Sequence, residues 1–127
     1  MTIRNLGYAD FESTIRTNGI VLVDFWASWC GPCRAFAPTF ERSATNHPEI
    51  VHAKVDTEQE SELAALMGIR SIPTIAAFRE GVLVFSQPGV LPPVALENLI
   101  SQIADLDMDQ VRAKIAARKA TSSTTTS

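Results

Sequence analysis

The sequence predicts an α/β protein with a central mixed five-stranded sheet flanked by helices. Two observations carry this prediction: segments typical of strands alternate with segments of helical periodicity, and the last two strand segments follow each other across a short turn. Alternation of strand and helix favours parallel strands, whereas a short turn joins antiparallel strands. Both strand directions are therefore expected in one sheet.

Strands are expected in five places, and the second is the most apolar. Residues 20–27 are apolar and β-rich except for Asp24, which indicates a buried central strand. Residues 50–56 form the next strand segment. Residues 74–78 and 82–86 form a hairpin across a three-residue turn. A short strand near the N-terminus completes the sheet.

Four helices are expected between or after these strands. The apolar residues of segment 32–45 recur at helical spacing directly after the two cysteines. Thr57 and Glu60 have the spacing of a capping box, in which each side chain binds the backbone N–H of the other residue, so a helix should begin there. The first helix contains Phe11 and Ile15, and the last follows Pro92 and Pro93.

Length and charge restrict the function classes. The chain has 127 residues, which fits one domain, and its formal net charge of −3 disfavours nucleic-acid and anionic-membrane partners. No apolar run is long enough to span a bilayer. Asp10 and Glu12 follow an N-terminus that lacks the basic and then apolar pattern of a signal peptide. We therefore expect a cytoplasmic protein, and a monomer is the expected state.

Cys30 and Cys33 are the two cysteines of the chain, and they lie three positions apart. A secreted disulfide scaffold usually spreads four or more cysteines along its sequence, so this pair points to redox chemistry or metal binding. Zinc usually takes four ligands, and the two histidines, His47 and His52, are not spaced as a ligand pair. The sequence therefore predicts no metal site.

The start of the helix at 32–45 predicts different roles for the two thiols. Cys30 and Cys33 lie about one helical turn apart, close enough for a disulfide. Unpaired N–H groups, that of Cys33 among them, and the positive end of the helix dipole lower the pKa of the Cys30 thiol and favour the reactive thiolate. Pro32 fits the first helical position, and Gly31 leaves the approach to Cys30 open. Cys33, on the apolar helix face, is expected to be more buried and to resolve the mixed disulfide that Cys30 forms.

Asp24 interrupts the buried strand six residues before Cys30. Burial costs a carboxylate free energy and raises its pKa, so Asp24 can accept a proton near neutral pH. One interpretation makes it the proton acceptor for Cys33, and the alternative is a buried carboxyl group satisfied by local hydrogen bonds. Lys54, in the next strand, either faces Asp24 and tempers its charge or is a solvated surface lysine.

Two further residues are candidates for the same site. Pro73 precedes a strand that is expected to be internal, where proline is unwelcome, so it should stand at the start of that strand. The sequence leaves open whether its peptide bond is cis or trans. Trp29 adjoins Cys30 in an exposed turn, where it serves either as a contact residue or in packing.

Three segments together resemble the thioredoxin family. Residues 23–33 read VDFWASWCGPC, residues 68–74 read GIRSIPT, and the FREG turn at 78–81 is followed by Pro88 and Gly89, in the order that the family has. The resemblance covers about residues 3–104 and implies the thioredoxin fold. It assigns a thioredoxin domain to residues 1–105.

The resemblance implies a protein-disulfide reductase that binds no cofactor and works through a Cys30–Cys33 dithiol. It implies that Asp24 is a buried acid with Lys54 as its partner, and that Pro73 is cis and faces the cysteines. It also implies an apolar groove for the substrate chain. Groove and active-site turn together contribute the substrate-binding residues Trp29, Gly31, Pro32, Ile72, Pro73, Gly89 and Val90.

The electron donor implied by the resemblance is a flavin-dependent, NADPH-using thioredoxin reductase. The implied substrates are oxidised proteins such as peroxiredoxins, methionine sulfoxide reductases and ribonucleotide reductase. Two alternatives stay open: an oxidase or isomerase of exported proteins, and a non-catalytic scaffold subunit. Gly31-Pro32 resembles the reducing type, and the presence of both cysteines and Asp24 disfavours a scaffold. Ser28 and Arg34 depart from the family's common residues, which bears on partner preference rather than on the chemistry.

The C-terminal part has no counterpart in the minimal family fold. Residues 106–119 are expected to form a helical extension, because Met108, Val111 and Ile115 fall on one side of a helix. Residues 120–127 are nearly all Ser and Thr, so a disordered tail is expected there.

Overall fold

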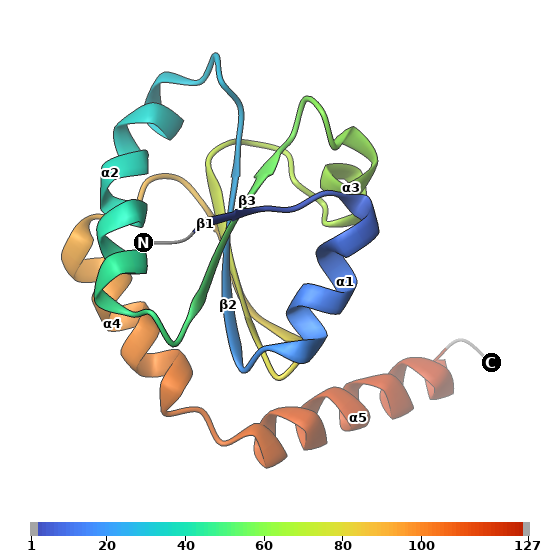
Figure 1. Cartoon of the computed structure of the whole chain (residues 1–127). Helices are drawn as coiled ribbons and strands as arrows, with labels where there is room; N and C mark the ends of the chain where they lie inside the picture. Colours follow the sequence, from blue (N-terminus) through green and yellow to red (C-terminus); the bar gives the residue numbers. More distant parts are fainter. Residues whose placement is uncertain (1–2, 126–127) are drawn as a thin grey trace.

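In a computed structural model, which describes residues 3–125, the chain forms a mixed five-stranded sheet (Figure 1). The strand order is β1-β3-β2-β4-β5, with β1, β3 and β2 parallel and β4 and β5 antiparallel to their neighbours. The predicted fold class is therefore confirmed. The strands are β1 Ile3–Asn5, β2 Ile20–Trp26, β3 Val51–Asp56, β4 Thr74–Arg79 and β5 Val82–Pro88.

Helices cover both faces of the sheet. In Figure 1, α2 and α4 lie on one side of the strands and α1 and α3 on the other, while α5 leads away from the body. The helices are α1 Tyr8–Thr17, α2 Gly31–Asn46, α3 Ser61–Leu66, α4 Pro93–Ala104 and α5 Met108–Thr125.

Strand β2 separates two apolar clusters and turns one face to each. Val23 and Phe25 pack with Phe11 of α1 on one face, whereas Leu22 packs with Phe36 and other residues of α2 and α4 on the opposite face. Side chains two positions apart on a strand point the same way. Asp24 therefore points, like Leu22, to the face that α2 covers.

The hairpin and the start of α3 differ from the sequence prediction. The hairpin turn has two residues, Glu80 and Gly81, both with positive φ, because β4 extends to Arg79. The predicted capping box is wrong: the Thr57 hydroxyl donates to the Trp26 carbonyl at 3.0 Å, and the Glu60 carboxylate accepts from the Tyr8 N–H at 2.9 Å. Both side chains are used to fix neighbouring elements, so α3 begins only at Ser61.

Arg79 joins the end of α4 to the segment before α5. Its guanidinium donates to the carbonyls of Ile103, Ala104 and Leu106 at 2.7, 3.0 and 2.8 Å, which satisfies acceptors that a helix end leaves free. The predicted helical extension is present and is longer than expected. Helix α5 runs through Thr125, although disorder was predicted from residue 120, and residues 126–127 lie outside the described range.

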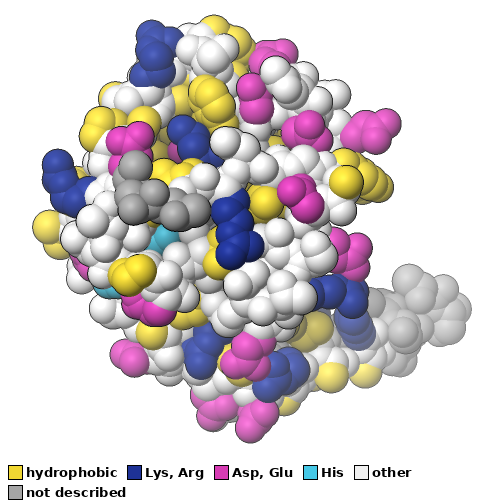
Figure 2. Space-filling model, in the orientation of Figure 1, with side chains coloured by type: hydrophobic (Ala, Val, Ile, Leu, Met, Phe, Trp, Pro, Cys, Tyr) yellow, Lys and Arg dark blue, Asp and Glu magenta, His cyan; other side chains and the backbone are white. Residues whose placement is uncertain are grey.

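The surface combines charged and apolar side chains. On the face in Figure 2, acidic, basic and apolar side chains are interspersed. Among residues 3–125, no helix combines the length and the apolar character that a membrane crossing requires. Within the same range, no group of three or more His, Cys, Asp and Glu side chains is placed to hold a metal ion.

Candidate active site

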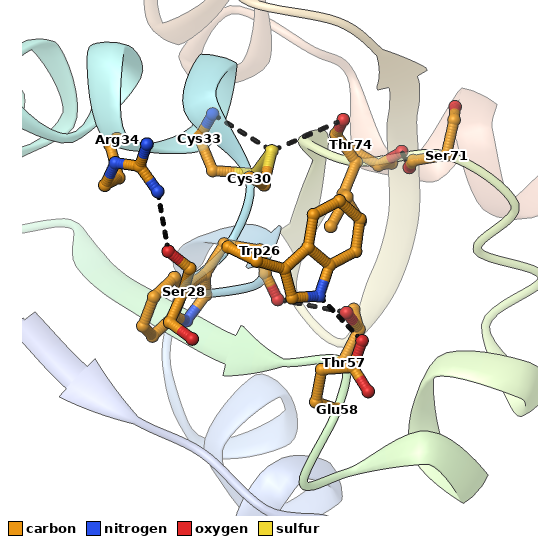
Figure 3. The surroundings of a disulfide bond; sticks show 11 residues. Trp26, Ser28, Cys30, Cys33, Arg34, Thr57, Glu58, Ser71 and Thr74 are labelled. Carbon is orange, nitrogen blue, oxygen red and sulfur yellow. Dashed lines mark hydrogen bonds between the residues drawn. A yellow bond between two sulfur atoms is a disulfide. The ribbon is translucent and has the colours of Figure 1, made fainter.

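Cys30 and Cys33 form a disulfide at the start of α2, as Figure 3 shows. Their Cα atoms lie 5.2 Å apart. Cys30 is the N-cap residue, and its Sγ accepts the backbone N–H of Cys33 at 3.2 Å. The predicted disulfide distance and the predicted donor to the Cys30 sulfur are thus both confirmed. Such a donor favours a thiolate at Cys30 after reduction.

The two cysteines are almost equally buried, although Cys33 was expected to be clearly more buried than Cys30. The exposed fraction is 3% for Cys30 and 2% for Cys33, because Trp26, Ala27 and Ile72 pack around the disulfide. The asymmetry between the two sulfurs has another source. Cys30 lines an open surface cavity, and Cys33 is not among the residues that line it.

The turn between the cysteines leaves the space over Cys30 open. Gly31 begins α2 and Pro32 follows it, so Pro32 takes the second helical position rather than the predicted first. Neither position requires an N–H inside the helix, so the proline is tolerated there. A Cβ at Gly31 would meet no atom within 4 Å, which agrees with the predicted open approach.

Asp24 is completely buried in β2. Neither of its carboxylate oxygens has a hydrogen-bond partner among residues 3–125, so the alternative in which local hydrogen bonds satisfy it is wrong. Desolvation by burial raises the pKa of Asp24 from its ordinary 3.8 to about 7, and the charge of Lys54 opposes this rise. Asp24 therefore changes protonation near neutral pH.

Lys54 is half-buried rather than fully solvated. It lies beside Asp24 in the register of β2 and β3, and side chains paired in this way share a face of the sheet. Its Nζ lies 4.4 Å from the centre of the Trp26 ring. The aromatic face thus holds the ammonium near the buried carboxyl group.

The loop before β4 packs against the disulfide. The Ile72–Pro73 bond is cis, as the resemblance implied, and the Ile72 carbonyl oxygen lies 3.8 Å from the Sγ of Cys30. The Pro73 carbonyl accepts the N–H of Gly89 at 2.8 Å, which brings the end of β5 to this loop. The side chain of Val90 follows and is exposed.

The cavity beside Cys30 extends in a direction that the sequence did not predict. Its volume is about 550 Å³. It contains Trp29, Gly31, Pro32 and Ile72 of the predicted binding residues, but Pro73, Gly89 and Val90 do not line it. Instead, its far wall is formed by α3 and by the segments on either side of that helix, through Thr57, Ser61, Ala64, Ala65, Ile69, Arg70 and Ser71.

Glu58 is a site residue that sequence reasoning missed. Its carboxylate accepts the indole N–H of Trp29 at 2.7 Å and so fixes the ring that borders the cavity. The Trp29 side chain is otherwise exposed. The two residues lie 29 positions apart and belong to no shared motif, so no local signal could have revealed the contact.

Comparison with known proteins shows whether the cysteine pair is an isolated motif or part of a known protein family. The sequence profile of the thioredoxin family matches residues 2–105. The chain belongs to the thioredoxin family. It is a protein-disulfide oxidoreductase whose redox-active group is the Cys30–Cys33 disulfide.

Relatives and solved structures agree with this assignment. A Streptomyces coelicolor protein provisionally named thioredoxin 2 is 50% identical over 111 residues, which cover 87% of this chain and 83% of that protein. A Haemophilus influenzae thioredoxin is 39% identical over 104 residues, or 79% of this chain and 95% of the relative. A Plasmodium falciparum thioredoxin structure superposes with a TM-score of 0.73 at 35% identity, covering 78% of this chain and 97% of that one.

Proposed function

We propose that this thioredoxin reduces protein disulfides with Cys30 as the nucleophile and Cys33 as the resolving thiol. The Cys30 thiolate attacks one sulfur of the substrate disulfide, that S–S bond breaks, and the other substrate sulfur leaves as a thiolate. Cys33 then gives up its proton and attacks the Cys30 sulfur. The second substrate thiol is released as the Cys30–Cys33 disulfide forms, so two electrons pass from the chain to the substrate.

The position of Cys30 carries this assignment. It lines the cavity at the surface and accepts the N–H of Cys33, whereas Cys33 lies behind it on the buried face of α2. A substrate sulfur can therefore approach Cys30 along the cavity. The same geometry supports an intramolecular second step, because the two sulfurs already lie within bonding reach.

Asp24 is proposed as the proton acceptor for Cys33. Its carboxyl group points to the sheet face that α2 covers, and its pKa of about 7 allows it to take and return a proton under neutral conditions. Lys54 is proposed as its electrostatic partner, which keeps part of the Asp24 population ionised.

The predicted substrate-binding residues are assigned by where they lie around the disulfide. We assign Trp29, Gly31, Pro32 and Ile72 to the cavity side of the substrate. Pro73, Gly89 and Val90 are assigned to the opposite side, where the Gly89 N–H meets the Pro73 carbonyl. Together these residues form the apolar groove for the substrate chain.

The oxidised chain must be returned to the dithiol by a reductant. We propose a flavin-dependent, NADPH-using thioredoxin reductase as this donor and the cytoplasm as the compartment, since thiols are kept reduced there. Peroxiredoxins, methionine sulfoxide reductases and ribonucleotide reductase are the proposed substrates. A structurally similar yeast chain supports the first class: it is 27% identical, has a TM-score of 0.72, and comes from a study of thiol resolution in a mitochondrial peroxiredoxin via the glutathione and thioredoxin systems.

Residues 1–105 are proposed as the catalytic domain, since they hold every residue assigned above. The extension from residue 106 onward takes no part in the chemistry.

Reduction of insulin, driven by NADPH and a purified thioredoxin reductase, tests the proposed function. We expect turnover that requires all three components. Absence of turnover together with normal reduction by a chemical dithiol would show that the proposed donor is wrong. Failure of the dithiol-reduced chain itself to reduce insulin would overturn the proposed reductase activity.

A further inference from the structure

The wall of the cavity opposite the disulfide has no role in the scheme above. It is built from small and apolar residues of α3 and the loop that follows, Ala64, Ala65 and Ile69, and Trp29 lines the same cavity. The polar residues Thr57 and Ser61 line it as well, and the Thr57 hydroxyl donates to the Trp26 carbonyl. A volume of about 550 Å³ exceeds what the reacting sulfur of a substrate needs and can take a neighbouring side chain as well.

Arg70 is the charged residue in this lining. Its side chain is exposed, and it makes no hydrogen bond or ion pair with any part of the chain between residues 3 and 125. The guanidinium of Arg34, also near the disulfide, is by contrast engaged with the Ser28 carbonyl at 2.8 Å. The nearby carboxylate of Glu58 is held by the Trp29 indole. Neither contact removes a charge, but Arg70 is the one charged side chain among the described residues that line the cavity, so its guanidinium is the group there that can attract an anion.

We propose that this cavity is a subsite for an acidic side chain adjacent to the reacting cysteine of a substrate protein, with Arg70 as its specificity-determining residue. This inference rests on the proposed function, because the substrate cysteine must sit at Cys30 for its neighbour to reach the cavity. The aliphatic stem of a glutamate packs between the Trp29 ring and the α3 wall. Its carboxylate meets the guanidinium of Arg70, which forms planar paired hydrogen bonds with carboxylates.

The size of the effect follows from the exposure of Arg70. An ion pair that stays accessible to solvent contributes little, so we expect roughly a two- to fivefold preference for a peptide with glutamate beside its cysteine over the same peptide with glutamine. A peptide with lysine at that position should react more slowly than either. Because exposed charges are screened by salt, the preference should shrink as ionic strength rises.

The test uses the full chain, reduced beforehand and freed of reductant, and three disulfide peptides that differ only in Glu, Gln or Lys beside the cysteine. Second-order rate constants are measured by chromatography of the reduced peptide. In Arg70→Gln the Glu-over-Gln ratio should fall to about one. Arg42→Gln is the matched control, since Arg42 is an exposed cation of α2 that lines a different cavity and its loss changes the net charge equally. It should keep the ratio.

Three outcomes would overturn the subsite: no Glu preference in the natural chain, a preference that survives in Arg70→Gln, or one lost equally in Arg42→Gln. The last would show attraction by net charge rather than by a local site. Failure of the proposed function looks different, because the glutamine peptide would then not be reduced at all. Circular dichroism of both variants confirms that a lost preference does not come from unfolding.

Discussion

Replacing Asp24 with Asn should stabilise the protein increasingly as pH rises. Asp24 is buried with both oxygens unpartnered, and its pKa is raised from 3.8 to about 7. The folded protein therefore binds more protons than the unfolded chain between these values, so this group lowers stability as pH increases through the interval and has its full effect above about pH 7. Asparagine has no proton to lose and removes that pH dependence.

The magnitude follows from the size of the pKa shift. A shift of about three units at about 1.4 kcal/mol per unit gives an upper limit of about 4 kcal/mol. Between pH 4 and pH 8 the stability of Asp24→Asn relative to the natural chain should accordingly grow by about 3–4 kcal/mol. The buried amide group brings a cost of its own, but that cost does not vary with pH and cancels in the comparison.

Urea unfolding of the oxidised proteins at pH 4 and pH 8 measures this difference. Asp105→Asn is the control, because Asp105 is an exposed carboxyl group at the end of α4, and its relative stability should stay constant. A relative stability of Asp24→Asn that is the same at both pH values would show that the pKa of Asp24 is not raised by folding. It would mean that the carboxyl group is solvated or paired in the folded protein.

Four further perturbations test the proton path, the junction before α5, the C-terminal extension and the positioning of Trp29. Asp24→Asn should slow release of the second substrate thiol at neutral pH, seen as longer-lived mixed disulfides by mass spectrometry; an unchanged lifetime across pH would make Asp24 purely structural. Arg79→Ala, which removes the donor to three carbonyls, should lower the free energy of unfolding by about 1–3 kcal/mol in urea titrations, whereas Arg42→Ala should not. Deleting residues 106–127 should leave insulin reduction intact, and a large loss would give α5 a role in the chemistry. Glu58→Ala should raise KM for insulin while Glu58→Gln, which keeps an acceptor for the Trp29 indole, restores it; equal KM values for both variants would exclude a positioning role.

The features that the sequence predicted are those with a local cause. The apolar run of β2 predicts burial, the helical spacing after Cys33 predicts α2, and the turn before β5 predicts an edge hairpin. The cysteine spacing and the N-cap position together predict the disulfide and the N–H donor to the Cys30 sulfur. Each of these depends on residues a few positions apart.

The features that were missed depend on contacts between distant segments. The Glu60 carboxylate accepts the N–H of Tyr8, which lies 52 positions away in the sequence, so the predicted capping box does not form. The Trp29 indole donates to Glu58, and the cavity that Trp29 lines extends to α3. No local pattern in the sequence indicates that direction. The burial of Cys30 likewise arises because the loop at Ile72 closes over it.

Trapping of mixed disulfides measures the unequal reactivity of the two cysteines. Reduced Cys33→Ser and Cys30→Ser variants are incubated with an oxidised protein substrate, and the adducts are measured by non-reducing electrophoresis and mass spectrometry. Because Cys30 lines the cavity and Cys33 does not, Cys33→Ser should accumulate the adduct through Cys30, and Cys30→Ser should form almost none. Equal trapping by the two variants would show that Cys30 and Cys33 do not have separate roles.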